Sequence, residues 1–233
     1  MIEFFDTIYK YRIMLWNGTR ITLIVSVATI ILGLFFGTLM AFMKISRFRL
    51  LRYIANVYVE FIRGTPVLVQ IFIVFYGLPI MGIDVPSIMI GGLDVSRLVS
   101  GTLALTVNTT AYVCEIVRSG IQSINIGQTE GARALGMSGN KAMFYVILPQ
   151  AIKNILPALG NEFVTIIKTS SQISVIGIAE LMYVADTIRG ISFKPMSPLI
   201  IISLIYFVIT FTLSCGIKKL EKNLSKSSRH SRN

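Results

Sequence analysis

The sequence predicts an all-α membrane protein with five membrane-spanning helices in a single domain, residues 1–233. Three observations lead to this prediction. Of 233 residues, 54% are hydrophobic and 14% are charged, whereas charged residues make up about a quarter of a soluble domain. The mean hydropathy is +0.72. Five apolar segments approach or exceed the roughly 20 residues that a helix needs to cross about 30 Å of hydrocarbon.

The five predicted spans are separated by more polar segments. In chain order they are Ile21–Met43, Val67–Met81, Leu98–Val117, Ile155–Leu181 and Pro198–Ile217, and a polar basic tail, residues 218–233, follows the last one. In the first span, the spacing of Gly33 and Gly37 lets another helix approach closely. Gly64, Thr65 and Pro66 precede the second span, and Pro66 lacks the backbone N–H that a continuous helix needs. We therefore expect a break or kink at that point.

The distribution of basic residues predicts the orientation in the membrane. Five spans put the termini on opposite sides, and cytoplasmic loops carry an excess of Lys and Arg. The side of the N-terminus has six: Lys10, Arg12, Arg20, Arg97, Arg189 and Lys194. The other side has fifteen: Lys44, Arg47, Arg49, Arg52, Arg63, Arg118, Arg133, Lys141, Lys153 and six in the tail. We therefore expect the N-terminus outside and the C-terminus in the cytoplasm.

The net charge of +11 is mainly this asymmetry. A basic chain can also indicate a nucleic-acid partner, but the sequence has no basic domain with interleaved aromatic residues, so no nucleic-acid partner is expected. The N-terminus lacks the basic-then-apolar layout of a cleaved signal peptide. The first span is therefore expected to remain in the mature protein.

The sequence lacks the motifs that would indicate an enzyme or a metal site. It contains no HExxH, no GxSxG and no GxxxxGK[ST] phosphate loop. Cys114 and Cys215 lie in apolar runs without CxxC spacing, and His230 stands alone in the tail. We expect no catalytic residue, no metal site and no cofactor bound by this chain, which excludes an intramembrane enzyme.

The segment Gly127–Gln150 is polar although it lies between two apolar spans. With the predicted orientation it is a cytoplasmic loop. The sequence predicts a short helix with Thr129 as a possible cap and Gly136 as a left-handed stop. A second helix restarts at Ser138 and is expected to end at Pro149. Two short helices on the membrane surface would form a compact knob for another protein, although a solvated connector is the simpler alternative.

The spacing within this loop resembles that of a known family. Glu130-Gly131-Ala132 is followed by Gly136 and, after nine residues, by Val146-x-Leu148-Pro149. This pattern is similar to the EAA loop of binding-protein-dependent ABC importers, which has Ala in place of Gly131 and usually Ile in place of Val146. The resemblance implies that partner ATPases are contacted by Glu130, Gly131, Ala132, Arg133, Gly136, Leu148 and Pro149.

Further stretches resemble the polar amino acid permeases, the histidine, glutamine and arginine branch of that family. They are "EFIRGTPVLVQ", "AYVCEIVRSGIQSINIGQTEGARALGM", "ILPQAIKNILPALGNEF" and "KTSSQISVIGIAEL", and the resemblance extends over about residues 17–217. It implies the type I ABC importer fold with cytoplasmic coupling helices, located in the bacterial inner (cytoplasmic) membrane. It also implies several partners: two ATPase subunits that hold ATP and Mg, a second permease subunit, identical or related, and an extracytoplasmic amino-acid-binding protein.

Two segments carry a similar pair of charges. Glu60 and Arg63 precede the second span, and Glu115 and Arg118 lie at the end of the third. Residues three apart share a helix face and can form an ion pair. Both pairs fall at the predicted cytoplasmic end, where they could lock a gate or merely neutralise charge at the membrane edge.

The fourth span carries a polar stripe. Asn161, Thr165, Lys168 and Gln172 follow helical spacing, and Glu162 and Thr169 lie on the flank. Charged side chains in a bilayer should face protein or water, because each costs at least ~2.5 kcal/mol there. We expect this stripe to line the pathway and bind a zwitterionic amino acid; the alternative is that Glu162 and Lys168 neutralise charges at an interface between subunits.

The sequence therefore favours one subunit of an ATP-driven importer of a polar amino acid. A stand-alone secondary carrier or channel for small polar solutes is the alternative, and it would need no docking loop. The sequence determines neither which amino acid is carried nor whether the two permease subunits are identical.

Overall fold

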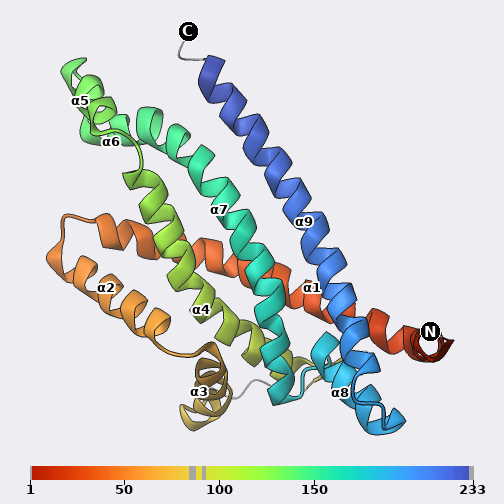
Figure 1. Cartoon of the computed structure of the whole chain (residues 1–233). Helices are drawn as coiled ribbons and strands as arrows, with labels where there is room; N and C mark the ends of the chain where they lie inside the picture. The colour runs from red at the N-terminus through yellow and green to blue at the C-terminus, as the bar shows by residue number, and fades with distance from the viewer. Residues whose placement is uncertain (1, 84–87, 91–92, 231–233) are drawn as a thin grey trace.

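The computed structural model describes residues 2–83, 88–90 and 93–230, and helices dominate it (Figure 1). The first helices are α1 (Ile2–Ile45), α2 (Arg49–Gly64) and α3 (Val67–Ile80), followed by two short antiparallel strands, β1 (Met89–Ile90) and β2 (Leu93–Asp94). Then come α4 (Val95–Gln122), α5 (Ile126–Ala134), α6 (Gly139–Ala142), a π-helical turn (Met143–Ile147), α7 (Leu148–Thr169), a 3₁₀ segment (Ser170–Ile176), α8 (Leu181–Ser192) and α9 (Ser197–His230). Residues 231–233 of the predicted tail lie outside the described residues.

Length and hydropathy identify most of the predicted spans. Within the described residues, three helical stretches can cross a membrane, Phe4–Ile45, Gly139–Ile176 and Ser197–Leu224, and the bent pair α2–α3 can be a fourth. The predicted third span coincides with α4, which has 28 residues but is too polar to pass the same test. Its hydroxyl residues Thr106, Thr109 and Thr110 are buried against neighbouring helices instead. The count of five spans stays a prediction, and the all-α class of the membrane fold is confirmed, with one short strand pair as its only β-structure within the described residues.

The break predicted at Gly64-Thr65-Pro66 is present. Helix α2 ends at Gly64 and α3 begins at Val67, at an angle of 111°. The close approach predicted at two glycines is also present. A Cβ on Gly33 would lie 2.5 Å from Thr109 Cγ2, and one on Gly37 would lie 2.6 Å from Val113 Cβ. These glycines therefore let α1 pack directly against α4.

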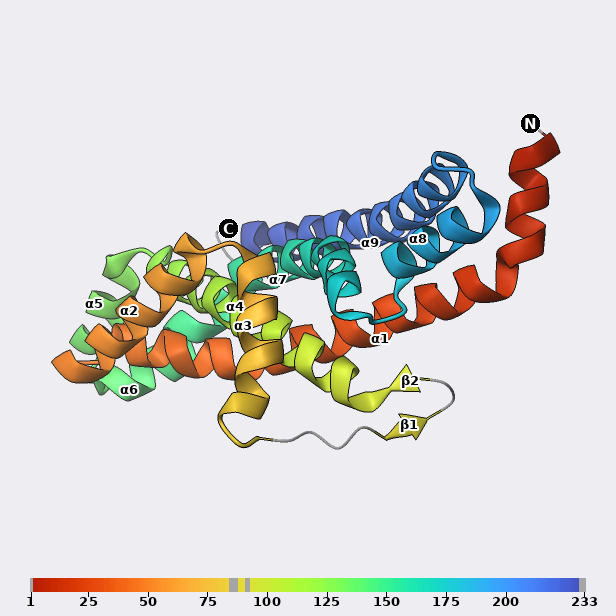
Figure 2. The same ribbon diagram turned by 90° about the horizontal axis from the view of Figure 1, so that it is seen from below.

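The elements are arranged with α5 and α6 at one end and α3 and α8 at the other (Figure 1). Helix α9 starts beside α8 and runs toward the end that holds α5 and α6, while α1 starts at the α8 end (Figure 2). The termini thus lie at opposite ends, as expected for the predicted orientation. Which end faces the cytoplasm stays a prediction.

Three groups of buried apolar side chains hold the helices together. One joins α1, α2, α4 and the start of α7, and another joins the start of α1 to α8 and α9. The third joins the middle of α1 to α3, α4 and the 3₁₀ segment. Helix α1 belongs to all three groups and α4 to two of them, so the α1–α4 pair forms the centre of the fold.

Candidate functional site

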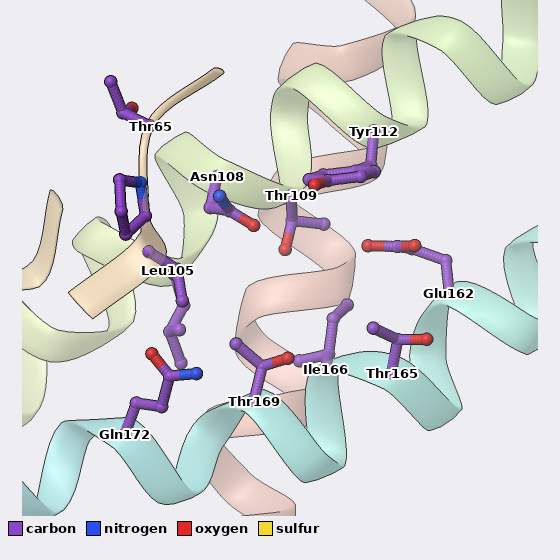
Figure 3. A pocket seen from close by; sticks show the side chains of 12 residues that line it. Thr65, Leu105, Asn108, Thr109, Tyr112, Glu162, Thr165, Ile166, Thr169 and Gln172 are labelled. Carbon is purple, nitrogen blue, oxygen red and sulfur yellow. The ribbon is translucent and has the colours of Figure 1, made fainter. Parts of the chain in front are cut away.

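A pocket of about 320 Å³ lies where the bend between α2 and α3 faces the middle of α4 and α7 (Figure 3). Its walls come from the α2–α3 bend, from α4, and from α7 with the 3₁₀ segment that continues it and carries Gln172. The lining residues are Thr65, Pro66, Val67, Leu105, Asn108, Thr109, Tyr112, Glu162, Thr165, Ile166, Thr169 and Gln172. The wall is therefore mixed, with hydroxyl, amide, aromatic and aliphatic groups around one carboxylate.

Four of the six residues predicted to bind substrate line this pocket, and two do not. Glu162, Thr165, Thr169 and Gln172 are in the lining, whereas Asn161 and Lys168 are exposed on another face of α7. The difference is geometric, because at about 100° per residue Asn161 and Lys168 both lie roughly 100° or more around the helix from Glu162. The face of α7 that lines the pocket is therefore centred on Glu162 and Thr169, the two residues predicted to lie on the flank of the stripe.

The polar residues that the sequence analysis missed come from the other two walls. Thr65 is at the α2–α3 bend, and Asn108, Thr109 and Tyr112 are on α4. A pattern within one helix could not find them, because the fold alone brings these segments beside α7. The sequence signal was present in Asn108-Thr109-Thr110, a polar run in the middle of an apolar segment.

The chemistry of the lining favours a polar ligand with positive charge or hydrogen-bond donors. Glu162 is the one ionisable carboxylate among the lining residues, and no Lys or Arg is among them. Lys168, the other charged residue of the predicted stripe, is outside the lining. A carboxylate that is partly shielded from water in a pocket binds an ammonium or guanidinium group more strongly than it would in bulk water.

The second predicted site, the charged pairs, is half formed. Glu115 and Arg118 pair, with Arg118 Nη2 2.7 Å from Glu115 Oε2, and Lys44 of α1 joins them. Glu60 is exposed, and the Arg63 guanidinium lies 5.6 Å from the centroid of the Tyr112 ring, so the expected Glu60–Arg63 pair is wrong. Arg63 instead stacks on an aromatic residue that also lines the pocket.

The third predicted site, the coupling loop, forms two short helices joined at Gly136. Gly136 has φ +84°, as predicted. The N–H of Met137 bonds to Ala132 O and the N–H of Gly136 bonds to Arg133 O, at 3.1 and 3.0 Å, which is a Schellman motif. Glu130, Gly131 and Arg133 of the predicted contact set are exposed and Ala132 is buried.

The cap of α5 was predicted wrongly and that of α6 correctly. Helix α5 begins at Ile126, because the Asn125 carboxamide oxygen accepts the N–H of Gly127 at 2.8 Å, so Thr129 lies inside the helix. Asn is at least as good a cap as Thr, and the prediction overlooked it. Ser138 caps α6 by accepting the N–H of Lys141 at 3.4 Å.

Pro149 does not end the second helix of the loop, contrary to the prediction. It lies in the first turn of α7, directly after the π-helical turn Met143–Ile147. The wider turn accommodates the proline ring, and the Gln150 side chain donates to Val146 O at 2.7 Å. The helical path is therefore continuous from Gly139 to Ile176, with Leu148 half-buried and Pro149 exposed.

Large apolar side chains are exposed on the coupling loop. Ile126 is 73% exposed, Leu135 86%, Phe144 61% and Tyr145 74%. Ile126 begins α5, Leu135 follows this helix, and Phe144 and Tyr145 lie in the π-helical turn after α6, so they flank the predicted contact set on both sides. Apolar exposure of this extent at a polar loop is typical of a surface that another protein covers.

A buried carboxylate lies apart from all three sites. Glu180 is 0% exposed, and its oxygens accept the Tyr183 N–H at 2.9 Å and the Tyr206 hydroxyl at 2.8 Å. It therefore caps α8 and ties it to α9. No group of three or more His, Cys, Asp or Glu residues within the described part of the chain could hold a metal.

The sequence and fold match a known family. Residues 33–226 match the family described as "Binding-protein-dependent transport system inner membrane component". The chain belongs to this family. It is 38% identical over 223 residues to the probable glutamine ABC transporter permease protein GlnM of Bacillus subtilis (strain 168), covering 96% of this chain and 97% of that protein. It is 37% identical to the arginine transport system permease protein ArtQ of the same organism, covering 97% and 99%.

Solved structures agree with this assignment. A chain described as "Crystal structure of an amino acid ABC transporter with histidines" has a TM-score of 0.86 and 42% identity, over 94% of this chain and 98% of that one. A chain described as "Inward facing conformations of the MetNI methionine ABC transporter", at 18% identity and a TM-score of 0.69, has the same fold. The chain is thus a multi-pass inner-membrane permease subunit of an ABC transporter, a transport component rather than an enzyme.

Proposed function

We propose that this chain forms the translocation pathway for a polar amino acid in an ATP-driven importer. The observation that carries the proposal is the pocket between the α2–α3 bend, α4 and α7, with Glu162 in its wall. Relatives at 37–38% identity are named as glutamine and arginine permeases, which supports a polar amino acid as the substrate. The volume of about 320 Å³ is at the lower end for ligand pockets, in keeping with a small substrate.

In this proposal the Glu130–Pro149 loop couples transport to ATPase subunits. The sequence has no phosphate loop, so ATP and Mg belong to the partner ATPase, in two copies. The exposed apolar side chains of the loop support a protein partner at this place. The complex contains a second permease subunit, identical or related, and an extracytoplasmic binding protein delivers the amino acid. The N-terminus is outside and the C-terminus is cytoplasmic.

Reconstitution tests the proposal. The chain is co-purified with its ATPase and placed in proteoliposomes with the binding protein, and uptake of labelled glutamine, arginine and histidine is measured with and without ATP. We expect uptake of at least one of them that requires ATP and disappears when the ATPase phosphate-loop lysine is changed to alanine. Uptake by the chain alone, without ATP, would instead support the alternative, a stand-alone carrier or channel.

A further inference from the structure

Gln70 is a buried amide in the first turn of α3, directly behind the pocket. It is 4% exposed and is not among the lining residues. Its Nε2 donates to Ile62 O at 2.7 Å and to Thr65 O at 3.1 Å, and it lies 2.8 Å from Thr65 Oγ1. The two carbonyl oxygens can only accept hydrogen bonds. The Gln70 amide nitrogen must therefore face the α2–α3 bend, and its oxygen must face α4.

The orientation of Gln70 determines that of Asn108. Asn108 Nδ2 donates to Gln70 Oε1 at 2.9 Å. Since Gln70 Oε1 can only accept, Asn108 must present its nitrogen to it, and its own oxygen then points the other way. Figure 3 shows this oxygen directed toward the side of the pocket that holds Thr109 and Glu162. Two carbonyl groups of the bend thus determine which atom of Asn108 faces the pocket.

Two neighbouring hydroxyl groups have a fixed polarity as well. Thr65 Oγ1 donates to Phe61 O at 2.9 Å, and Thr165 Oγ1 donates to Asn161 O at 3.1 Å. Each hydroxyl has a single proton, so what it can offer a ligand is a lone pair. These two hydroxyls, the Asn108 oxygen and the Glu162 carboxylate therefore present acceptors, whereas the lining residues Thr109, Tyr112, Thr169 and Gln172 can also donate.

We propose that Gln70 is a positioning residue that holds Asn108 as a hydrogen-bond acceptor toward the pocket, so that the pocket selects substrates by a donor group beside Asn108. The inference rests on the proposed function of the pocket. The group selected is an ammonium or a primary amide. A ligand carbonyl or carboxylate at the same place would face the Asn108 oxygen, and two acceptors in contact repel each other. Such a ligand is therefore rejected more strongly than one that merely lacks a hydrogen bond to Asn108.

The test measures selectivity of binding to the purified permease–ATPase complex. Labelled L-glutamine is the probe, and the competitors are L-glutamate, which replaces the amide NH₂ with oxygen, and glutaramate, which lacks the α-ammonium group. The binding protein is omitted because it binds amino acids itself. We expect the wild-type complex to bind at least one competitor roughly tenfold more weakly than glutamine. The Kd of that competitor divided by the Kd of glutamine is the selectivity ratio, and the variants are compared by this ratio.

Gln70→Met keeps the length of the side chain and removes both of its polar atoms. The Asn108 amide can then turn, so we expect the selectivity ratio to fall about fivefold, the size of one hydrogen bond. Asn108→Asp in the Gln70→Met background presents an oxygen in either orientation, so we expect the ratio to return. A packing defect at the bend would not be repaired by that second change.

Two further variants complete the design. Asn108→Ala removes the proposed acceptor and leaves the bonds from Gln70 to the bend intact. It therefore tests the acceptor even if the Gln70→Met complex is recovered poorly. We expect the selectivity ratio of Asn108→Ala to fall as well. Thr106→Val is the matched control, because Thr106 is buried in α4 outside the pocket and donates to Thr102 O at 2.8 Å. Its ratio should be that of the wild type.

The outcomes separate this inference from the function on which it rests. An unchanged ratio in Asn108→Ala, or no recovery with Asn108→Asp, overturns the role of Gln70. If Glu162→Gln nevertheless weakens glutamine binding, the pocket assignment stands and the role of Gln70 alone is wrong. If Glu162→Gln also leaves binding unchanged, the assignment of the pocket fails with it.

Discussion

Lys44 Nζ, at the end of α1, lies 2.5 Å from Glu115 Oε1 in α4. The two residues are 71 positions apart in the sequence, and their side chains are 13% and 18% exposed. Glu115 also binds Arg118, so one carboxylate balances two cations. This carboxylate joins α1 to α4 two turns before α4 ends and the chain enters the coupling loop.

We expect Glu115→Gln to lower the stability of the complex more than Lys44→Met does. The first change leaves two neighbouring cations without their anion, and the second leaves the Glu115–Arg118 pair intact. Removing one member of a largely buried network costs about 1–3 kcal/mol after discounting for partial exposure. Thermal unfolding of the purified complex measures the difference, with Glu60→Gln as an exposed control that should unfold like the wild type. Equal losses for the two variants would contradict the shared-anion arrangement.

Gly136→Leu should uncouple ATP hydrolysis from transport without preventing membrane insertion. The residue has φ +84°, a conformation that costs a residue with a Cβ roughly 1 kcal/mol or more. Relief of that strain would displace α5 relative to α6 and so disturb the surface proposed to contact the ATPase. Uptake per ATP hydrolysed in proteoliposomes is the measurement.

Gly131→Ala is the control for that variant, because it gives a glycine of the same predicted contact set the alanine that the EAA loop pattern has there. Nothing lies within 4 Å of a Cβ at this position, and the helix gains up to about 1 kcal/mol. Normal coupling is therefore expected. Normal coupling in Gly136→Leu would show that the loop is assigned wrongly.

Glu162→Gln should weaken substrate binding to the permease–ATPase complex about ten- to hundredfold, because one charge-assisted hydrogen bond is lost. The yield of the complex should change little. Lys168→Gln is the matched control, since Lys168 is on the same helix but exposed outside the pocket, and its binding should be that of the wild type. Unchanged binding in Glu162→Gln would exclude a substrate contact, and a collapsed yield would indicate a structural carboxylate.

Gly33→Val should separate α1 from α4. The new Cβ would lie 2.5 Å from Thr109 Cγ2, a contact that requires the helices to move, and overpacking of this kind costs about 1–3 kcal/mol. Thr109 also lines the pocket, so substrate binding should fall together with the unfolding temperature. Gly216→Ala, on an open part of α9, should leave both unchanged. A wild-type unfolding temperature in Gly33→Val would contradict the close packing.

Tyr206→Phe should destabilise the junction of α8 and α9. The variant removes the hydroxyl that donates to the buried Glu180 carboxylate at 2.8 Å. An acceptor left with fewer partners in the interior costs about 1–3 kcal/mol. Limited proteolysis of the α8–α9 connection, compared with Tyr76→Phe at an exposed tyrosine, measures this loss. Equal cleavage rates would show that the Glu180–Tyr206 bond contributes little.

Features that depend on short stretches of sequence were predictable. Pro66 and Gly136 impose local backbone geometry, and Gly33 and Gly37 leave room for a neighbour wherever that neighbour comes from. The membrane class was predictable as well, because it depends on the composition of the chain and not on which residues come into contact. The cap at Thr129 was wrong because Asn125, four residues earlier, competes for the same role and starts the helix first.

Features that depend on tertiary contacts were not predictable from spacing alone. Glu60 and Arg63 have the spacing of a pair, yet Tyr112 on another helix offers Arg63 a stacking surface. The face of α7 that lines the pocket is another case. Lys168 belongs to the predicted polar stripe, but the pocket lies against the flank of the stripe, which carries Glu162. Which face of a polar helix matters is decided by what packs against it.

The helix that continues past Pro149 has a mechanical consequence. From Gly139 to Glu162 the helical path is unbroken and about 35 Å long at 1.5 Å per residue, with the π-helical turn Met143–Ile147 and Pro157 as its two points of weaker backbone hydrogen bonding. If this segment moved as one body, pivoting it by about 10° at its α6 end would swing Glu162 by about 6 Å. In the proposed coupling, a movement of the loop would therefore reach the carboxylate of the pocket as a displacement, and the π-helical turn at Met143–Ile147 and Pro157 are the places where the stiffness of that lever can be altered.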